Sequence, residues 1–200
     1  MIRVFLLAFL MGQLHQSAGQ YQWKQQKDKD GIKVYVSDVA GSNFKAVKVE
    51  CTFTGTYVKL FSILTDVAHL SDWVYNAKSS YLLKQVNPLD IIYFVETHLP
   101  WPLSNRDAVI HLRIRTDSMP KFFTITGTGE PNFIPEKSGK VRVPHYAASW
   151  KVAMPTQKSI QINYVVEVDP GGSIPAWISN MFVDKGLYES FKKLAELLSK

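Results

Sequence analysis

The sequence predicts an α+β domain in which a curved antiparallel sheet wraps around one long C-terminal helix. Most of the chain consists of short segments of alternating polarity separated by tight turns, which is typical of antiparallel strands. The last thirty residues instead carry apolar side chains at three- and four-residue steps, as a helix does. A helix of about 25 residues is roughly 37 Å long. Its wide apolar face therefore needs a large surface, and the sheet is the available one.

The first nineteen residues have the composition of a secretory signal peptide. Arg3 supplies the positive end, 4–14 form the apolar run, and Ser17-Ala18-Gly19 precede an expected cleavage at Gln20. An apolar run of this length is too short to span a membrane. A buried N-terminal helix is the alternative, because a single basic residue precedes the run. We therefore expect a secreted or periplasmic protein whose one domain covers residues 20–200.

Composition limits the classes of function. About 180 mature residues, of a chain that is 46% hydrophobic, fit one domain without repeats or linkers. The formal charge is +6, or +5 without Arg3 (22 Lys and Arg against 17 Asp and Glu), and the basic residues are scattered, so we expect no nucleic-acid partner. Cys51 cannot form an internal disulfide and is expected to be a buried, unreactive thiol. No nucleophile elbow, phosphate loop or paired-cysteine motif predicts an enzyme, cofactor or metal site.

The expected elements follow from these periodicities and from the turn residues between them. Asp30-Gly31 is expected to form the first turn, and Ser173 to cap the last helix with Pro175 in its first turn. In order, we expect a short charged helix over 21–29, strands over 32–36 and 44–54, a helix within 55–74, strands near 78–86, 91–99, 108–115, 122–128, 146–154 and 159–168, and the C-terminal helix to Lys200.

Alternation within the strands predicts a sheet with one dry face. The dry sets are Ala108, Ile110, Leu112 and Ile114 in one strand and Ile160, Ile162, Tyr164, Val166 and Val168 in another, each alternating with more polar residues. A helix across that face leaves either a packed core or a tunnel. Periodicity does not distinguish the two, and composition alone favours the packed core.

Three motifs, in this order and at these distances, carry a resemblance to a known family. They are KDGIKVY at 29–35, PWPLSNRD at 100–107 and VDPGGSIPAW at 168–177, and Trp73 and Trp150 fit as well. With them, residues from about 23 to 198 resemble the START domain, the lipid-binding family related to steroidogenic acute regulatory protein, in a bacterial-type secreted form. The resemblance implies a helix-grip fold with a lipid-sized hydrophobic tunnel between sheet and helix, and so favours the tunnel.

Arg106 is the residue we expect to define the polar end of that tunnel. It precedes a strand whose residues of the same parity face the dry side, and a buried arginine needs an anionic or carbonyl partner. The resemblance implies an arginine in the cavity that pairs with a strand acid or meets a lipid headgroup. Glu96 is the expected partner, and Asp90 is the alternative. Headgroup recognition and a structural ion pair that closes one end of the barrel both stay open.

The remaining expected site residues are aromatic or apolar side chains with inward parity or on the inner face of the helix. The expected ligand-binding set is Arg106, Glu96, His98, Trp73, Tyr93, Ala108, Ile110, Trp150, Tyr164, Ile178, Met181, Phe182 and Tyr188, with Met119 and Trp177 as gate residues. Gly186 either lets the helix bend or permits close packing.

We therefore expect a monomer that encloses one lipid or sterol-like molecule, for transfer or sensing, and that contacts a membrane transiently. One alternative is a cyclase- or hydrolase-like enzyme on the same fold that uses Glu96, His98 and Arg106 as acids and bases. The other is an extracytoplasmic interaction module with a filled core. The sequence leaves the lipid class open.

Overall fold

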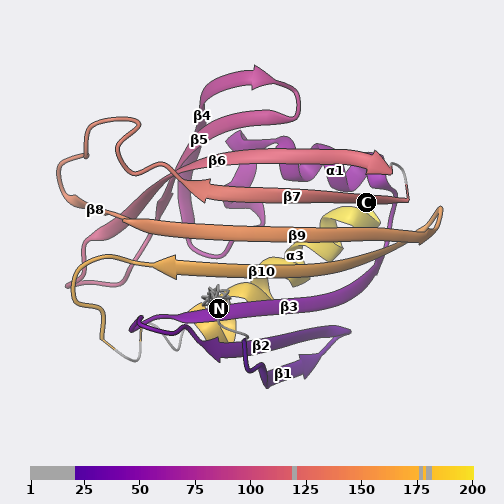
Figure 1. Ribbon diagram of the computed structural model, residues 1–200, viewed down its shortest axis with the longest axis horizontal. Helices are drawn as coiled ribbons and strands as arrows, with labels where there is room; N and C mark the ends of the chain where they lie inside the picture. The colour runs from indigo at the N-terminus through magenta and orange to yellow at the C-terminus, as the bar shows by residue number, and fades with distance from the viewer. Residues whose placement is uncertain (1–20, 119–120, 176–177, 179–181) are drawn as a thin grey trace, which may run out of the picture.

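The computed structural model describes residues 21–118, 121–175, 178 and 182–200. Its strands form one curved sheet, with the helices on one face of it (Figure 1). In chain order the elements are β1 Lys24–Lys29, β2 Ile32–Asp38, β3 Lys45–Thr54, α1 Tyr57–Thr65, the 3-10 helix η1 Val67–Asp72, β4 Ala77–Asn87, β5 Asp90–Thr97, β6 Asn105–Ser118, β7 Phe122–Gly129, β8 Lys140–Arg142, β9 His145–Thr156, β10 Ser159–Asp169, the π-helix η2 Phe182–Gly186 and α3 Leu187–Ser199.

The sheet confirms the predicted α+β helix-grip architecture. Its strand order is β1-β2-β3-β10-β9-β7-β6-β5-β4, and every pair along this path is antiparallel. β8, which the sequence did not predict, pairs in parallel with the first residues of β6. The sheet is not closed, so β1 and β4 are its edges. The C-terminal helix lies across the concave face (Figure 1).

The predicted alternation is also confirmed on the concave face. The residues of the dry sets in β6 and β10 are buried, apart from the half-buried Val168 at the end of its strand. The outer face is less exposed to solvent than expected, because the loop over residues 130–139 covers part of it. Beneath that loop Ile92, Phe94 and Val109 form a second small apolar cluster, against which Leu83 and Ile134 pack.

The predicted helix over 21–29 is wrong, because residues 24–29 form strand β1. Its charged sequence carries no apolar stripe, and it pairs antiparallel with β2 across the turn at Asp30 and Gly31. Both turn residues have positive φ, 55° and 73°, and glycine adopts such values without strain. A strand so rich in Lys and Asp is suited to a sheet edge, because exposed charges discourage pairing with another chain.

The helix expected within 55–74 is divided in two. Thr56 caps α1, its hydroxyl accepting from the amide of Lys59 at 3.3 Å. Asp66, at φ −80° and ψ 73°, ends α1, and the chain continues as the 3-10 helix η1. The apolar stripe persists through the break, so Leu60, Leu64 and Leu70 are all buried.

The C-terminal helix begins later than predicted, since Ser173 to Pro175 are not helical. Its described residues are Ile178, the π-helix η2 and α3, which packs Phe191, Leu194 and Leu198 into the core. A Cβ at Gly186 would lie 3.3 Å from the Tyr75 ring, a tight contact, so of the two predicted roles close packing is the one that the structure supports. None of the described helices is both long enough and apolar enough to cross a membrane.

Candidate functional site

A cavity of about 1320 Å³ lies between the concave face of the sheet and the C-terminal helix. Side chains from most strands of the sheet, from η1 and from the helix line it, and small residues such as Gly127 and Ala148 form part of the wall. A close-packed protein interior holds few voids larger than a water molecule. The cavity therefore favours the tunnel that the resemblance implied over the packed core that composition alone favoured.

The inner wall of the cavity is aromatic. The ring of Trp150 on β9 lies 4.5 Å from that of Tyr164, 5.3 Å from that of Phe191 and 6.4 Å from that of Trp73. Phe191 belongs to α3, so this cluster fixes the helix to the sheet while leaving space beside it. Tyr93 and Tyr146 line the same space, and burial raises the pKa of both and of Tyr164, so all three phenols keep their protons at neutral pH.

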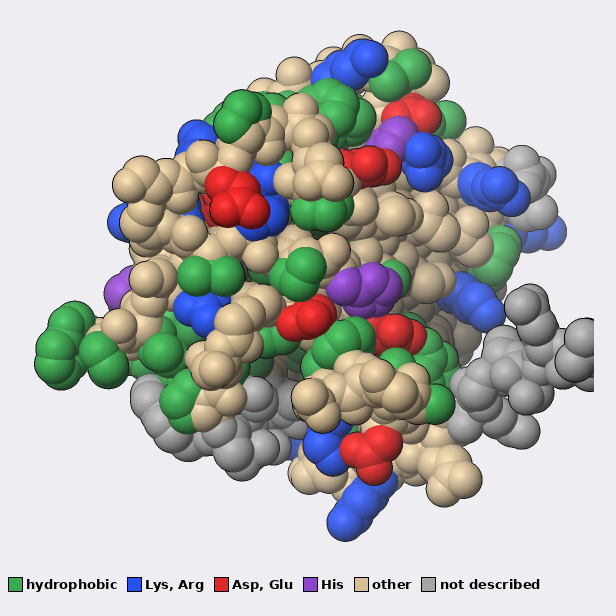
Figure 2. Space-filling view, turned by 60° about the vertical axis from the view of Figure 1, so that its left-hand side comes forward, with side chains coloured by type: hydrophobic (Ala, Val, Ile, Leu, Met, Phe, Trp, Pro, Cys, Tyr) green, Lys and Arg blue, Asp and Glu red, His purple; other side chains and the backbone are tan. Residues whose placement is uncertain are grey.

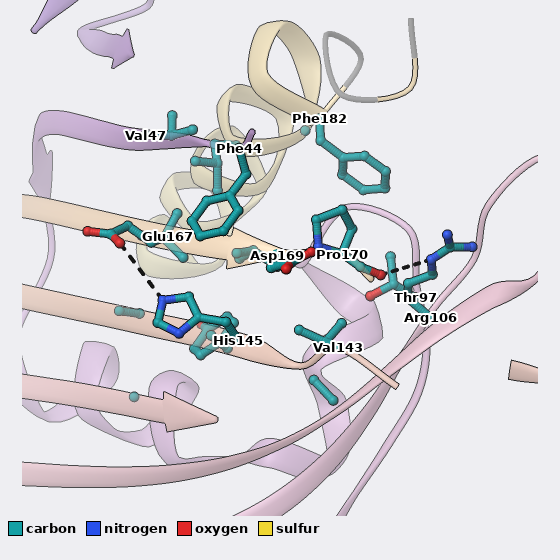
Figure 3. Close-up of a pocket in the computed structure, with 18 of the residues that line it drawn as sticks. Phe44, Val47, Thr97, Arg106, Val143, His145, Glu167, Asp169, Pro170 and Phe182 are labelled. Atoms are coloured by element: carbon teal, nitrogen blue, oxygen red, sulfur yellow. Dashed lines mark hydrogen bonds and ion pairs between the residues drawn. The ribbon is translucent and has the colours of Figure 1, made fainter. Parts of the chain in front are cut away.

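One end of the cavity, which we call the mouth, is lined by 39–44 between β2 and β3, by Lys45 at the start of β3, by 143–145 and by 167–172. There the Phe44 ring stacks on that of His145 at 5.7 Å, and His145 Nε2 lies 3.8 Å from a Glu167 carboxylate oxygen (Figure 3).

Figure 2 shows one face of the molecule, on which Lys and Arg are interspersed with acidic and hydrophobic side chains. That distribution differs from the single basic patch of a nucleic-acid interface.

Arg106 lines the cavity near the mouth and is only 6% exposed. Its guanidinium donates to the carbonyl of Pro170 at 3.1 Å (Figure 3). It also donates to the carbonyls of Ser104 at 2.6 Å and Gly171 at 3.1 Å. Gly171 has a positive φ of 69°, in the turn that carries the Pro170 and Gly171 carbonyls. Among the described residues no carboxylate lies within ion-pair distance of Arg106. Burial without a compensating negative charge lowers its pKa.

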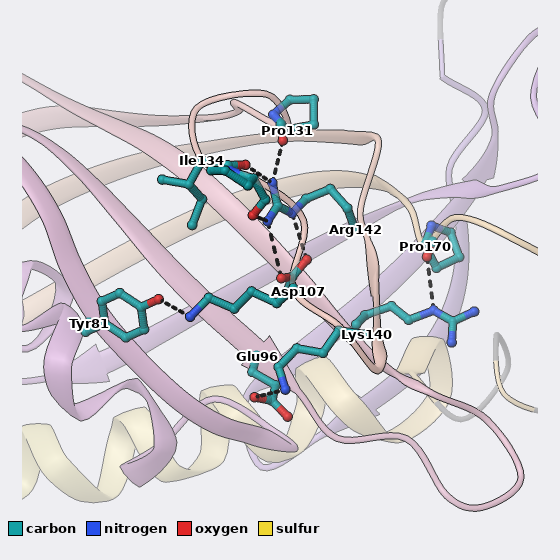
Figure 4. Close-up of polar contacts among 11 residues, drawn as sticks. Tyr81, Glu96, Asp107, Pro131, Ile134, Lys140, Arg142 and Pro170 are labelled. Atoms are coloured by element: carbon teal, nitrogen blue, oxygen red, sulfur yellow. Dashed lines mark hydrogen bonds and ion pairs between the residues drawn. The ribbon is translucent and has the colours of Figure 1, made fainter.

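The prediction that Glu96 or Asp90 pairs with Arg106 is wrong. In the β5–β6 register Thr97 opposes Arg106 and Glu96 opposes Asp107, and alternation turns the Glu96–Asp107 pair to the outer face. Glu96 there accepts from Asn105 at 2.6 Å and pairs with Lys140 at 3.0 Å (Figure 4). Asp90, at the far end of β5, contacts His111 at 2.5 Å.

The structure places most of the other predicted site residues in the cavity wall. Those lining it are Trp73, Tyr93, Arg106, Ala108, Ile110, Trp150, Tyr164, Ile178 and Phe182. His98 is exposed at the end of β5, and the Tyr188 hydroxyl binds Asp30 instead of facing the cavity. Met119, Trp177 and Met181 lie outside the described residues. Glu96, His98 and Arg106 therefore do not converge, and the proposed acid–base set is not assembled.

Sequence reasoning missed other residues of the wall. Tyr146 has the parity of Ala148 and Trp150 and could have been found from alternation. Gly127, a glycine inside a strand, was a signal of close approach. The mouth residues Phe44 and Glu167 carried no such signal, because only the folded chain brings them together.

The described residues hold no group of three or more His, Cys, Asp or Glu side chains that could bind a metal. Cys51 is buried as predicted, and burial raises the pKa of its thiol. It does not line the cavity. The interior of the cavity offers apolar contacts, phenol hydroxyls and the buried Arg106 cation, and the mouth adds His145 and Glu167.

An open sheet wrapped around a helix, with a cavity between them, defines a helix-grip domain. The chain belongs to the START domain family, whose model matches residues 13–200. It is similar, at 32% identity over 100% of this chain and 98% of the relative, to an uncharacterised protein of Pseudomonas aeruginosa. It is 26% identical to the phosphatidylcholine transfer protein of Bos taurus, over 87% of this chain and 83% of that protein.

A solved structure shares the fold. The STAR-related lipid transfer protein of Xanthomonas axonopodis, a crystal structure of a fragment, superposes with a TM-score of 0.80 at 29% identity and covers 89% of this chain and 99% of that one. START domains are known for lipid binding and transfer.

Proposed function

We propose that this protein carries or senses one lipid molecule, held in the cavity with its apolar part against the aromatic wall and an anionic group at Arg106. Arg106 is the observation that carries the proposal: a buried cation beside a large apolar cavity, bonded only to backbone carbonyls among the described residues. A buried charge is stable when it is paired, so the cavity offers an anionic group a partner.

The size of the cavity supports a lipid ligand. Small-molecule pockets have about 300–1,000 Å³, whereas this cavity has about 1320 Å³. Burial of apolar surface stabilises a complex by about 25 cal/mol per Å². The walls thus supply affinity for hydrocarbon, and Arg106 supplies discrimination, because apolar walls discriminate weakly between chains. Carriage is favoured over catalysis because the acid–base set predicted from the sequence does not converge.

The test is native mass spectrometry of the mature protein from its producing cells, with solvent extraction of bound molecules. We expect a one-to-one adduct that extracts as lipid. Ala108 lines the cavity on β6, so Ala108→Trp should fill space and prevent loading, whereas Val109→Leu on the outer face should load normally. A wild-type protein that stays free of ligand after incubation with mixed lipid vesicles would contradict the proposal.

Exchange of lipid requires contact with a membrane, and Trp101 is the side chain that we propose makes it. It is 90% exposed, in the connection between the cavity-lining residues Leu99 and Arg106. Tryptophan is enriched at membrane interfaces. Trp101→Ala should slow lipid transfer between vesicles several-fold without changing the amount of lipid bound at equilibrium. Equal transfer rates for wild type and variant would remove Trp101 from the mechanism.

The cellular setting is part of the same proposal. Residues 1–19 are proposed to direct secretion or export to the periplasm, and the mature protein to act as a monomer without nucleic acid. N-terminal sequencing of the protein from its own cells should begin at Gln20. A mature chain that retains Met1 would contradict the export.

A further inference from the structure

Three tyrosines from three strands are grouped in the interior of the cavity. Tyr93 on β5, Tyr146 on β9 and Tyr164 on β10 all line it. Tyr93 and Tyr164 are only 7% and 6% exposed. Their hydroxyls are close enough to influence one another, since Tyr146 raises the pKa of the other two and Tyr93 raises that of Tyr164, in each case after the larger effect of burial.

The group brings phenol hydroxyls to an otherwise largely apolar wall. The contact between the hydroxyls of Tyr146 and Tyr164 raises the pKa of Tyr164 and lowers that of Tyr146, although burial raises both more strongly. A phenol hydroxyl is a hydrogen-bond donor, and a polar group in an apolar cavity is stabilised when it has a partner. A ligand oxygen that accepts from these hydroxyls is therefore stabilised.

The neighbouring strand β7 is adapted to hold Tyr146. A Cβ at Gly127 would lie 3.1 Å from Cε1 of the Tyr146 ring, and a Cβ at Gly129 would lie 3.1 Å from the Tyr146 amide nitrogen. Glycine inside a strand weakens it, and often marks close approach of another group. Gly127 therefore leaves room for the Tyr146 ring, and Gly129 lets the backbone of Tyr146 approach β7 closely.

Tyr93 lies farther from the mouth than Arg106 does. Tyr93 opposes Ile110 on β6, four residues beyond Arg106, which is about 13 Å at 3.3 Å per residue. The cavity thus has two polar positions along its length. Arg106 supplies a cation near the mouth, and the tyrosines supply neutral hydroxyl donors farther in. A ligand that satisfies both has an anionic group and, closer to its hydrocarbon, neutral acceptor oxygens.

We propose that Tyr93, Tyr146 and Tyr164 form a subsite that hydrogen-bonds an ester carbonyl of a glycerophospholipid. This inference rests on the proposed function and deepens it. A free carboxylate fits the inner position poorly, because the phenols bring no positive charge and the cationic Arg106 lies nearer the mouth. The volume of about 1320 Å³ favours a lipid with two chains over a compact sterol.

The test is a competition between two lipids that differ only in the proposed contact. Wild-type protein is incubated with vesicles of dioleoyl phosphatidylcholine mixed equally with its dioleyl diether analogue, which keeps the headgroup and lacks ester carbonyls. Native mass spectrometry then gives the ratio of the two bound lipids. We expect at least a tenfold preference for the diester in the wild type. Tyr93→Phe and Tyr146→Phe should bring the ratio towards one.

Two further variants test whether the position of the Tyr146 ring matters and whether the loss of a hydroxyl outside the cavity has any effect. Gly127→Ala keeps every hydroxyl but displaces the Tyr146 ring, and should also lower the ratio. Tyr81→Phe removes a hydroxyl on the outer face of the sheet, outside the cavity, and should keep the wild-type ratio. Thermal unfolding of each variant shows that it is folded.

The outcomes are distinguishable. Loading of both lipids without preference in the wild type, or a preference that the tyrosine variants retain, would overturn the subsite while leaving the carrier function intact. Displacement of bound phospholipid by cholesterol in a second incubation, lost in the tyrosine variants, would overturn the ester assignment. Failure of the wild type to load either phospholipid or cholesterol would overturn the proposed function itself.

Discussion

Arg106 and Asp107 are neighbours on β6, yet their side chains meet opposite surroundings on the two faces of the sheet. Asp107 is 1% exposed and pairs with Arg142, Nε to Oδ1 at 2.7 Å and Nη2 to Oδ2 at 3.3 Å (Figure 4). The remaining donors of Arg142 bond carbonyls of the loop over 131–135. Arg106 has three carbonyl partners and a cavity beside it.

The difference separates a structural charge from one available to a ligand. On the outer face the protein supplies both the anion and the acceptors for Arg142, and the loop closes over the pair. On the concave face it supplies acceptors but no anion for Arg106 among the described residues. A buried ion pair becomes strongly unfavourable when one member is removed. The two sites should therefore respond differently to mutation.

Removal of the Asp107 carboxylate should have the largest effect on stability. Asp107→Ala leaves the Arg142 cation buried and unpaired, and we expect it to lower the free energy of unfolding by about 3–5 kcal/mol. Urea denaturation measures this. The matched control is Asp38→Ala, since Asp38 pairs with Lys45 at the exposed surface, where an ion pair contributes about 0–1 kcal/mol. Similar losses for the two variants would show that the buried pair is not a principal anchor.

Replacement of Arg106 should affect binding more than stability. Arg106→Leu removes three hydrogen bonds to carbonyls, and we expect a smaller loss of unfolding free energy than for Asp107→Ala, about 1–3 kcal/mol. The amount of phospholipid bound from vesicles should fall at least tenfold. Arg115→Leu changes an exposed arginine on the same strand and should bind as the wild type does. Unaltered lipid binding by a folded Arg106→Leu protein would reduce this residue to a structural role.

Glu96 extends the comparison to pH. Burial is the largest single effect and raises its pKa, but hydrogen bonds from Asn105, Lys140 and Lys78 outweigh it and hold the pKa at about 2, below the ordinary 4.5. A depressed carboxylate pKa stabilises the fold above the unfolded value, and this contribution is lost as pH falls from about 4.5 to about 2. Glu96→Gln should therefore flatten the acid limb of the stability curve.

That pH dependence is measured by urea unfolding at a series of pH values between neutral and acid. Glu136→Gln, at an exposed position in the loop over 130–139, serves as the control and should leave the acid limb unchanged. If the free energy of unfolding falls as steeply at acid pH in Glu96→Gln as in the wild type, groups other than Glu96 cause the loss of stability.

The fold was largely predictable because its signals are local. Alternation in β6 and β10 and the helical stripe after Ile178 depend on burial of one face, and burial leaves a pattern in the sequence. β1 was missed because six charged and polar residues carry no such pattern, and only pairing with β2 makes them a strand.

The site was harder to predict because it depends on contacts between distant residues. Arg106 was found from its position before a strand with a buried face. Two of its three partners come from the turn after β10, through carbonyls that any residue type provides. The predicted pairing of Arg106 with Glu96 was wrong because Glu96 lies on the outer face of β5. It is an odd number of residues from Tyr93, which lines the cavity, so the two side chains point to opposite faces. Tyr146 depends on space left by Gly127, which lies on another strand.

A third cation, Lys137, should give the smallest effect, because it is exposed and lies over aromatic rings. Its Nζ lies 4.5 Å from the centre of the Phe94 ring and donates to the Tyr81 hydroxyl at 2.6 Å (Figure 4). We expect Lys137→Met to lower the free energy of unfolding by about 0.5–1 kcal/mol, the range of exposed cation–π contacts.

The control for Lys137→Met is Lys84→Met, since Lys84 on the edge strand β4 is exposed and has no cation–π contact or ion pair with the described residues. That variant should be indistinguishable from the wild type. The three cations then rank by what their surroundings supply: a carboxylate for Arg142, carbonyls for Arg106 and ring faces for Lys137. A loss for Lys137→Met as large as that for Asp107→Ala would break this ranking, because it would show that exposure does not weaken a charge contact here.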